Sequence, residues 1–197
     1  MGYFQKAKQV PNLERAQVAV RRLTGGGAIH HAKELTFSIT CAARHALYAG
    51  EVRRSYEAIH GAIAEVLGDY AVQASFRGQG ALLSDKPATG MCFEHSTDLD
   101  LAWDGSKGVG SAQRRTGGRV LHHGSIKLGR SDLDASVAAL WDHTPDVSPQ
   151  DLAGRLCSHF AQRFDLDFET DEPTRAEAEH AQRRAEHFTS QAFIHRR

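Results

Sequence analysis

The sequence predicts a protein of the α+β class, with a mixed, mostly antiparallel β-sheet and helices packed on it. Three observations support this prediction. Residues 98–128 show strand alternation interrupted by glycine turns, and residues 51–70 and 148–164 carry apolar side chains at helical spacing. No linker-like run divides the chain, so we expect residues 1–197 to form a single domain, which is long enough to bury a real core.

The first forty residues are predicted to form short elements around a glycine-rich turn. A short helix is expected to begin at Asn12, which is a good N-cap residue. Residues 18–22 are predicted to be a strand that leads into the turn at 24–27. Residues 28–31 and 35–41 follow as further strands, the second rich in β-branched and aromatic residues.

The middle of the chain combines an amphipathic helix with an antiparallel meander. The helix is predicted from apolar residues three to four apart between about 51 and 70, and a loop follows at 78–87. Two-residue turns at 104–105 and 117–118 join the three strands of the meander. In its first strand an apolar set alternates with an acidic set: Leu99, Leu101 and Trp103 against Asp98, Asp100 and Asp104.

Helices dominate the predicted C-terminal third. We expect helices over 131–141 and 148–164, and a last, highly charged helix from Pro173 to about 188. The second of these has one apolar stripe, which consists of Leu152, Leu156, Phe160 and Phe164.

Composition narrows the functional classes. Twenty-four basic residues balance 24 acidic ones, so no net charge favours nucleic acid or a membrane surface. No apolar stretch approaches the roughly 20 residues that span a bilayer, and the N-terminus lacks the apolar core of a signal peptide. Three cysteines without a CxxC motif indicate a reducing compartment. A cytoplasmic location is therefore expected.

A glycine-rich motif suggests an anion or acyl site. The string RRLTGGGAIHH at residues 21–31 returns, one residue shorter, as RRTGGRVLHH at residues 114–123. Fixed cations beside exposed backbone N–H groups can hold a phosphate, a carboxylate or an activated acyl carbonyl. The alternative is that the glycines form only a tight turn. Metal binding is not expected, because adjacent histidines on a strand point to opposite faces and no cysteine or carboxylate pair lies nearby at metal spacing.

Cys92 and Lys107 each admit two interpretations from the residues alone. Cys92 is either a loop nucleophile near cations or a buried thiol beside Phe93. Lys107 is either a solvated turn residue or a functional lysine whose flanking glycines allow a close approach. The other thiols, Cys41 and Cys157, are predicted to belong to the core.

Together these segments resemble the lipoate–protein ligase and octanoyltransferase branch of the biotin/lipoate ligase superfamily. Residues 21–38 resemble the signature RRxTGGGAxxHxxELTYS, and residues 104–115 resemble its Gly-x-Lys-x-x-Gly-Ser-Ala-Gln-Arg run. HGSI at 123–126, GYFQ at 2–5 and the FIHRR end at 193–197 extend the similarity over nearly the whole chain. Relative to the family we expect an initial strand and helix to be missing, which leaves two alternatives: a misassigned start, or an incomplete chain that needs a partner. We also expect the small C-terminal accessory domain that the ligases often carry or recruit to be missing.

The resemblance implies an acyl pocket beneath the glycine loop. It implies that acyl or adenylate groups are bound by Arg22, Gly25, Gly26, Gly27, Ala28, His31, Gly110 and Ser111. Lys107 matches the lysine that contacts the acyl carbonyl. Cysteine-type octanoyltransferases have Cys-Phe 15 residues before that lysine, which is the spacing of Cys92-Phe93 from Lys107. Cys92 and Lys107 are thus the implied catalytic pair.

The implied reaction is octanoyl transfer in protein lipoylation. The donor would be octanoyl acyl-carrier protein, and the acceptor a lysine of a lipoyl domain, as in dehydrogenase E2 subunits or the glycine cleavage H protein. No cofactor is required, since the thioester is already activated. We expect Lys107 to stabilise the oxyanion and, if burial lowers its pKa, to deprotonate the incoming amine. The alternatives are a lipoate–protein ligase that uses ATP and Mg to form lipoyl-AMP, and a non-catalytic lipoate-binding subunit.

Overall fold

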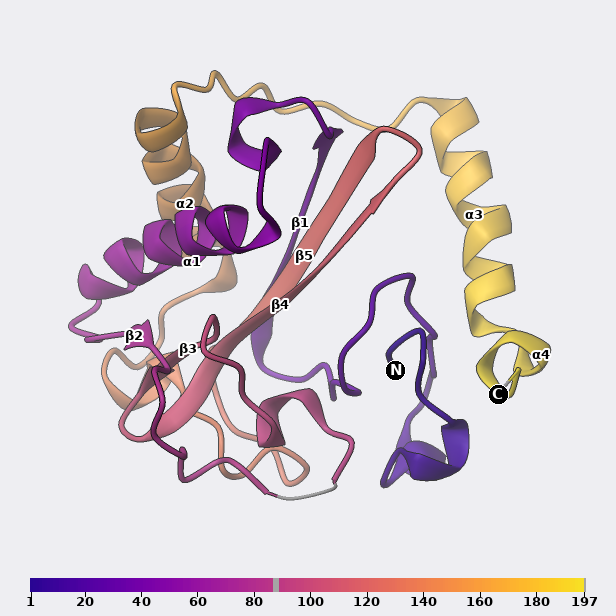
Figure 1. Cartoon of the computed structure of the whole chain (residues 1–197), viewed down its shortest axis with the longest axis horizontal. Helices are drawn as coiled ribbons and strands as arrows, with labels where there is room; N and C mark the ends of the chain where they lie inside the picture. The colour runs from indigo at the N-terminus through magenta and orange to yellow at the C-terminus, as the bar shows by residue number, and fades with distance from the viewer. Residues whose placement is uncertain (87–88, 197) are drawn as a thin grey trace.

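The computed structural model describes residues 1–86 and 89–196 and contains one five-stranded sheet (Figure 1). Its strands are β1 (Glu34–Ala42), β2 (Ser75–Phe76), β3 (Leu101–Trp103), β4 (Ser106–Thr116) and β5 (Arg119–Lys127), in the spatial order β1-β5-β4-β3-β2. Every neighbouring pair is antiparallel. The α+β prediction is therefore confirmed, and so is the meander at 98–128. Positive φ angles at Asp104, Gly105, Gly117 and Gly118 close its two hairpins.

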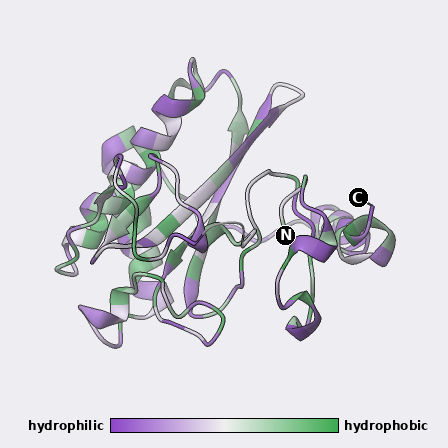
Figure 2. Cartoon of the chain, turned by 60° about the horizontal axis from the view of Figure 1, so that its bottom comes forward, coloured by the Kyte–Doolittle hydropathy of each residue, from purple (hydrophilic) through white to green (hydrophobic). Residues whose placement is uncertain are grey.

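Two helices cover one face of this sheet (Figure 1). Helix α1 (Val52–Gly68) buries Ile59, Ile63 and Leu67 against the sheet. Helix α2 (Pro149–Phe164) starts where the Ser148 side chain accepts a hydrogen bond from the Asp151 N–H, and it ends at Asp165, which has a left-handed backbone. Both helices were predicted. Figure 2 shows hydrophobic ribbon where they meet the sheet, whereas the far end of the β4–β5 hairpin is hydrophilic.

Helix α3 (Arg175–Thr189) and the short α4 (Gln191–Ile194) lie apart from α1 and α2, beside the N-terminal segment (Figure 1). The predicted last helix is thus present. None of the helices within the described ranges has the length and apolar character that crossing a membrane requires.

Three local predictions for the first forty residues are wrong. Residues 18–22 and 28–31 are not strands: their backbones bond to the chain ends and loops, and only Ala28 forms an isolated bridge, with Met91. The helix expected after Asn12 is a single 3-10 turn, η2 (Leu13–Arg15).

Residues 131–141 do not form a helix. The Ala138 N–H donates to the Lys107 carbonyl and the Trp141 N–H to the Leu128 carbonyl, so pairing with the ends of β4 and β5 overrides local helix propensity. Only the short 3-10 turn η5 (Leu140–Asp142) is helical there. Cys157 is exposed on α2, not in the core, and Cys41 is half-buried.

Candidate active site

Cys92 and Lys107 meet at the start of β4, the middle strand of the sheet. Cys92 is the first residue of η4 (Cys92–Glu94), a 3-10 turn, and Lys107 is the second residue of β4. The Lys107 Nζ atom lies 3.6 Å from the Cys92 Sγ atom and donates to the carbonyl oxygens of Cys92 (2.9 Å) and His95 (3.2 Å). The turn that carries the thiol is therefore tied to the lysine ammonium by its own backbone.

A β-bulge turns Lys107 toward this site. Leu101 of β3 pairs with Val109, but the next residue, Ala102, pairs with Lys107, so β4 has one residue more than its partner strand. Without the bulge Lys107 would share the core face with Val109. It lies instead over Gly110, where an added Cβ would be 2.7 Å from the Lys107 Cε atom. This explains the need for glycine at position 110.

Asp100 keeps Lys107 charged. The Asp100 Oδ2 atom lies 2.8 Å from Nζ and also accepts from the Thr97 N–H, and only 5% of Asp100 and 2% of Lys107 is exposed. Burial acts to lower the pKa of Lys107, but the charges of Cys92 and Asp100 outweigh it and raise the pKa above its usual value. The condition under which Lys107 was expected to deprotonate the incoming amine, a pKa lowered by burial, is therefore not met. Asp100, which the sequence placed in the acidic set of this strand, is buried.

The glycine loop packs directly on the cysteine turn. The Cys92 N–H donates to the Ala28 carbonyl (2.7 Å), and the Ala28 N–H donates to the Gly90 carbonyl (2.9 Å). A Cβ on Gly27 would be only 2.7 Å from the Cys92 nitrogen and 2.8 Å from the Gly90 oxygen. Only glycine allows this approach. Of the predicted loop residues, Gly27 and Ala28 thus pack on the backbone of the turn that carries the thiol, whereas Gly25 lies near Phe4 and Gly26 near the Arg22 guanidinium.

The two arginines of the motif hold backbone. The Arg22 guanidinium donates to the carbonyls of Gly25 (2.6 Å) and Gly27 (2.8 Å), which fixes the curve of the glycine loop. Arg21 is completely buried and donates to five carbonyls in the N-terminal segment and α4. The sequence suggested that these two arginines are part of an anion-binding site. In the structure the guanidinium hydrogen bonds described above go to backbone carbonyl oxygens, so both arginines hold the backbone around the site.

The histidines of the two similar motifs have different partners. His31 is 60% exposed, and its Nδ1 atom lies 2.5 Å from a Glu34 carboxylate oxygen. His123 on β5 bonds to the Thr24 hydroxyl (2.6 Å), so the second motif supports the first. Burial, with the charges of Arg22 and His31, lowers the pKa of His123 to about 4.

Ser111, predicted to contact the acyl group, lies in a buried network on the α1 side of the sheet. Its hydroxyl lies 2.7 Å from Nε2 of His60 and 2.9 Å from Nε2 of His122, and Nδ1 of His122 faces the Tyr48 hydroxyl at 3.3 Å. Since His60 Nδ1 donates to the Leu99 carbonyl, Ser111 donates to His60 and accepts from His122. This network supports Leu99, the residue before Asp100.

Sequence reasoning missed this network and the contact of Asp100 with Lys107. Burial is the main cause that lowers the pKa of His60, and it lowers the pKa of His122 to about 3, so both imidazoles are neutral. The alternation of Ser111 and Gln113 with glycine and alanine on β4 was the one pattern that pointed to a polar group on the inner face.

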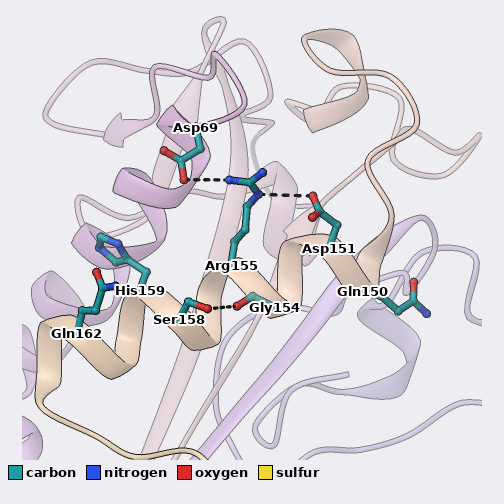
Figure 3. Close-up of a pocket in the computed structure, with 8 residues that line it drawn as sticks. All are labelled: Asp69, Gln150, Asp151, Gly154, Arg155, Ser158, His159 and Gln162. Carbon is teal, nitrogen blue, oxygen red and sulfur yellow. Dashed lines mark hydrogen bonds and ion pairs between the residues drawn. The ribbon is translucent and has the colours of Figure 1, made fainter.

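A cavity of about 1150 Å³ adjoins the glycine loop on the other face of the sheet. Its lining includes Arg22, Ala28, His31, Met91 and His123, but not Cys92 or Lys107. A second hollow of about 640 Å³ lies between α1 and α2, where Arg155 bridges Asp69 and Asp151 (Figure 3). That surface is remote from the thiol. Within the described parts of the chain no cluster of three histidine, cysteine or carboxylate side chains is arranged to hold a metal ion.

The fold and the site define the class: an α+β domain in which a cysteine, a buried lysine and a glycine loop meet at one end of the central strand of a single sheet. Residues 1–150 match the family described as the lipoyl protein ligase A/B catalytic domain. The chain belongs to this family, as its resemblance implied.

Individual relatives agree with this assignment. The chain is 36% identical over 132 residues to the octanoyltransferase LipM of Moorella thermoacetica, which covers 65% of this chain and 48% of the relative. It is 33% identical over 173 residues to LipM of Brevibacillus brevis, covering 83% and 60%. The chain thus spans about half the length of the curated relatives that it matches. A lipoate-protein ligase A solved with bound ATP shares the fold, with a TM-score of 0.78 at 21% identity over 99% of this chain and 80% of that one.

Proposed function

We propose that this chain transfers an octanoyl group from a thioester donor, through a thioester on Cys92, to a lysine of a lipoyl domain. The observation that carries the proposal is the Cys92 thiol held 3.6 Å from a buried ammonium that Asp100 keeps charged. The similarity of this chain to proteins named octanoyltransferase favours this reaction. A bi-partite lipoate protein ligase of similar fold, described with its E2 lipoyl domain, suggests the acceptor class.

In the first step the Cys92 thiolate attacks the octanoyl carbonyl. A new C–S bond forms, the donor's C–S bond breaks, and the donor thiolate leaves and takes up a proton. The Lys107 ammonium faces the sulfur and can stabilise the oxyanion that develops, an effect worth roughly 3–4 kcal/mol for one donor in known sites. Octanoyl acyl-carrier protein is the donor that we propose.

In the second step the lysine amine of the lipoyl domain attacks the acyl-enzyme. The amide C–N bond forms, the C–S bond to Cys92 breaks, and the thiolate returns to the Lys107 ammonium. Because Lys107 is already protonated, the proton of the amine leaves to another acceptor. The reaction needs no ATP, since the thioester supplies the activation.

The remaining predicted residues shape the acyl site in this proposal. Gly25, Gly26, Gly27 and Ala28 offer backbone against which the acyl group lies, with Arg22 fixing their curve. Gly110 gives Lys107 its place. Ser111 acts from the inner face through the two histidines, and His31 lines the neighbouring cavity.

Mass spectrometry of the 197-residue chain tests the proposal. Incubation with octanoyl acyl-carrier protein, without ATP, should add one octanoyl group that maps to Cys92 and is absent from Cys92→Ser. Cys157→Ser is the matched control, because Cys157 is exposed and distant, and it should retain the adduct. Modification of a lipoyl domain only when lipoate and ATP are supplied would instead establish the ligase. If neither assay detects modification, the result would favour the non-catalytic lipoate-binding subunit.

A further inference from the structure

A second buried lysine lies beside the site and has no part in the reaction proposed above. Lys127 of β5 is completely buried, and its Nζ atom contacts Glu34 Oε2 at 2.7 Å, Asp134 Oδ2 at 3.0 Å and the His30 carbonyl at 2.9 Å. Burying an ammonium is costly even when it is paired. A fully buried lysine at the end of a strand therefore calls for an explanation beyond packing.

The aromatic ring that follows Cys92 in the chain is close to both buried lysines. Phe93 follows Cys92 directly in η4 and is 2% exposed. Its ring centroid is 4.7 Å from the Nζ atom of Lys127 and 5.4 Å from that of Lys107. A cation over an aromatic face is attracted by the ring quadrupole, and more strongly when water is excluded.

The double histidine of the glycine motif helps to hold Lys127 in place. His31 bonds to Glu34, and His30 lies 3.5 Å from Asp134, so each carboxylate is shared by Lys127 and one histidine. Burial acts to raise the pKa of Glu34, but the His31 hydrogen bond and the Lys127 charge lower it to about 2. The carboxylate is thus ionised at neutral pH, and it holds the Lys127 ammonium beside Phe93.

We propose that Lys127 is a positioning residue for the acyl-transfer reaction, which acts through the Phe93 ring to keep Cys92 beside Lys107. Glu34 and Asp134 fix the ammonium, the ammonium fixes the ring, and the ring fixes η4. This inference rests on the proposed function for its reaction, but not for its geometry.

A double-mutant cycle tests this chain of contacts. Lys127→Met, Phe93→Leu and the double variant are compared for the rate of Cys92 alkylation by iodoacetamide, mapped by mass spectrometry, and for kcat and KM of octanoyl transfer. Each single variant should lower the alkylation rate and kcat about tenfold with KM unchanged, and the double variant should be no worse than either. Lys86→Met is the matched control, because Lys86 pairs with Glu94 of the same turn from solvent, and it should change neither rate.

Additive losses in the double variant would overturn the proposal, since Lys127 would then act independently of the ring. Phe93→Leu leaves all charges in place, so wild-type rates in that variant alone would also overturn it. Thermal unfolding of each variant separates these effects from misfolding. If Lys127→Met fails to fold, Lys127→Met/Asp134→Asn, which keeps the net charge of the cluster, replaces it. If no octanoyl adduct forms in the wild type, the proposed function fails, while the alkylation cycle still tests the positioning role.

Discussion

Replacing Asp100 by asparagine should separate the charge of the lysine from its position. Asp100→Asn removes the carboxylate 2.8 Å from Lys107 Nζ but keeps the shape of the side chain. Burial, which lowers the pKa of Lys107, would then be opposed only by Cys92. We therefore expect the ammonium to lose its proton at a lower pH than in the wild type.

The magnitude follows from the burial of both partners. Removing one partner of a buried ion pair costs roughly 3–5 kcal/mol, and a neutral Lys107 relieves part of that cost. A loss of about 3 kcal/mol lowers the melting temperature of a chain of this length by roughly 6–12 °C. The ammonium is present below the pKa of Lys107 and lost above it. The alkaline limb of the activity profile should therefore lie at lower pH in Asp100→Asn than in the wild type.

Two measurements check this expectation: thermal unfolding, and the pH dependence of acyl-enzyme formation over the neutral and alkaline range. Asp98→Asn is the matched control, because Asp98 is two residues away but pairs with Arg53 near the surface. An Asp100→Asn profile that overlays the wild type would refute the argument that this carboxylate keeps Lys107 charged.

Three further predictions concern the same site. Gly27→Ala should slow acyl-enzyme formation and lower the melting temperature, because the new Cβ would be less than 3.0 Å from backbone atoms of Cys92 and Gly90. The yield of the octanoyl adduct and the thermal unfolding curve measure these two effects. Lys107→Met should slow Cys92 acylation by roughly 10²–10³-fold, measured by rapid-quench mass spectrometry, and an unchanged rate would remove the lysine from the mechanism. Because the pKa of buried His122 is lowered to about 3, this imidazole is protonated between about pH 3 and 6.5 only in the unfolded chain. The free energy of unfolding should therefore fall by about 1.4 kcal/mol per pH unit below about 6.5. Thermal unfolding at pH 7 and pH 5 measures this, and His122→Gln should show a shallower pH dependence.

Local sequence patterns correctly predicted the helices and strands that are determined by interactions between residues close in sequence. Helices α1 and α2 and the β4–β5 hairpin follow from apolar spacing, an N-cap serine and turn glycines, and the structure contains them. Residues 131–141 were predicted to be helical from the same kind of local pattern, but their N–H groups donate to carbonyls at the ends of β4 and β5. Spacing of apolar residues within the segment cannot reveal such tertiary hydrogen bonds.

The candidate pair was found by resemblance, but its electrostatics were not. In an ideal strand Lys107 would lie on the core face with Val109, and the bulge that turns it away is set by pairing with β3. Nothing in the sequence singled out Lys127, which lies between Ile126 and Leu128 at the end of β5. It is buried against Phe93 of η4, which is distant in sequence, and against Asp134, which lies seven residues further along the chain.

A last prediction concerns the two adjacent arginines of the glycine motif, Arg21 and Arg22, because their guanidinium groups bind different parts of the chain. Arg21 donates to carbonyls of Gly2, Tyr3, Gln5, Phe193 and Ile194, so Arg21→Met leaves several buried acceptors unpaired, each worth about 1–3 kcal/mol. It should lower the melting temperature strongly, while Cys92 acylation below the transition stays near the wild-type rate. Arg22→Met frees only the loop carbonyls of Gly25 and Gly27, and should slow acylation with a smaller loss of stability. Equal effects of the two variants on both measurements would contradict this division, since the cations would then form one cradle as their sequence first suggested.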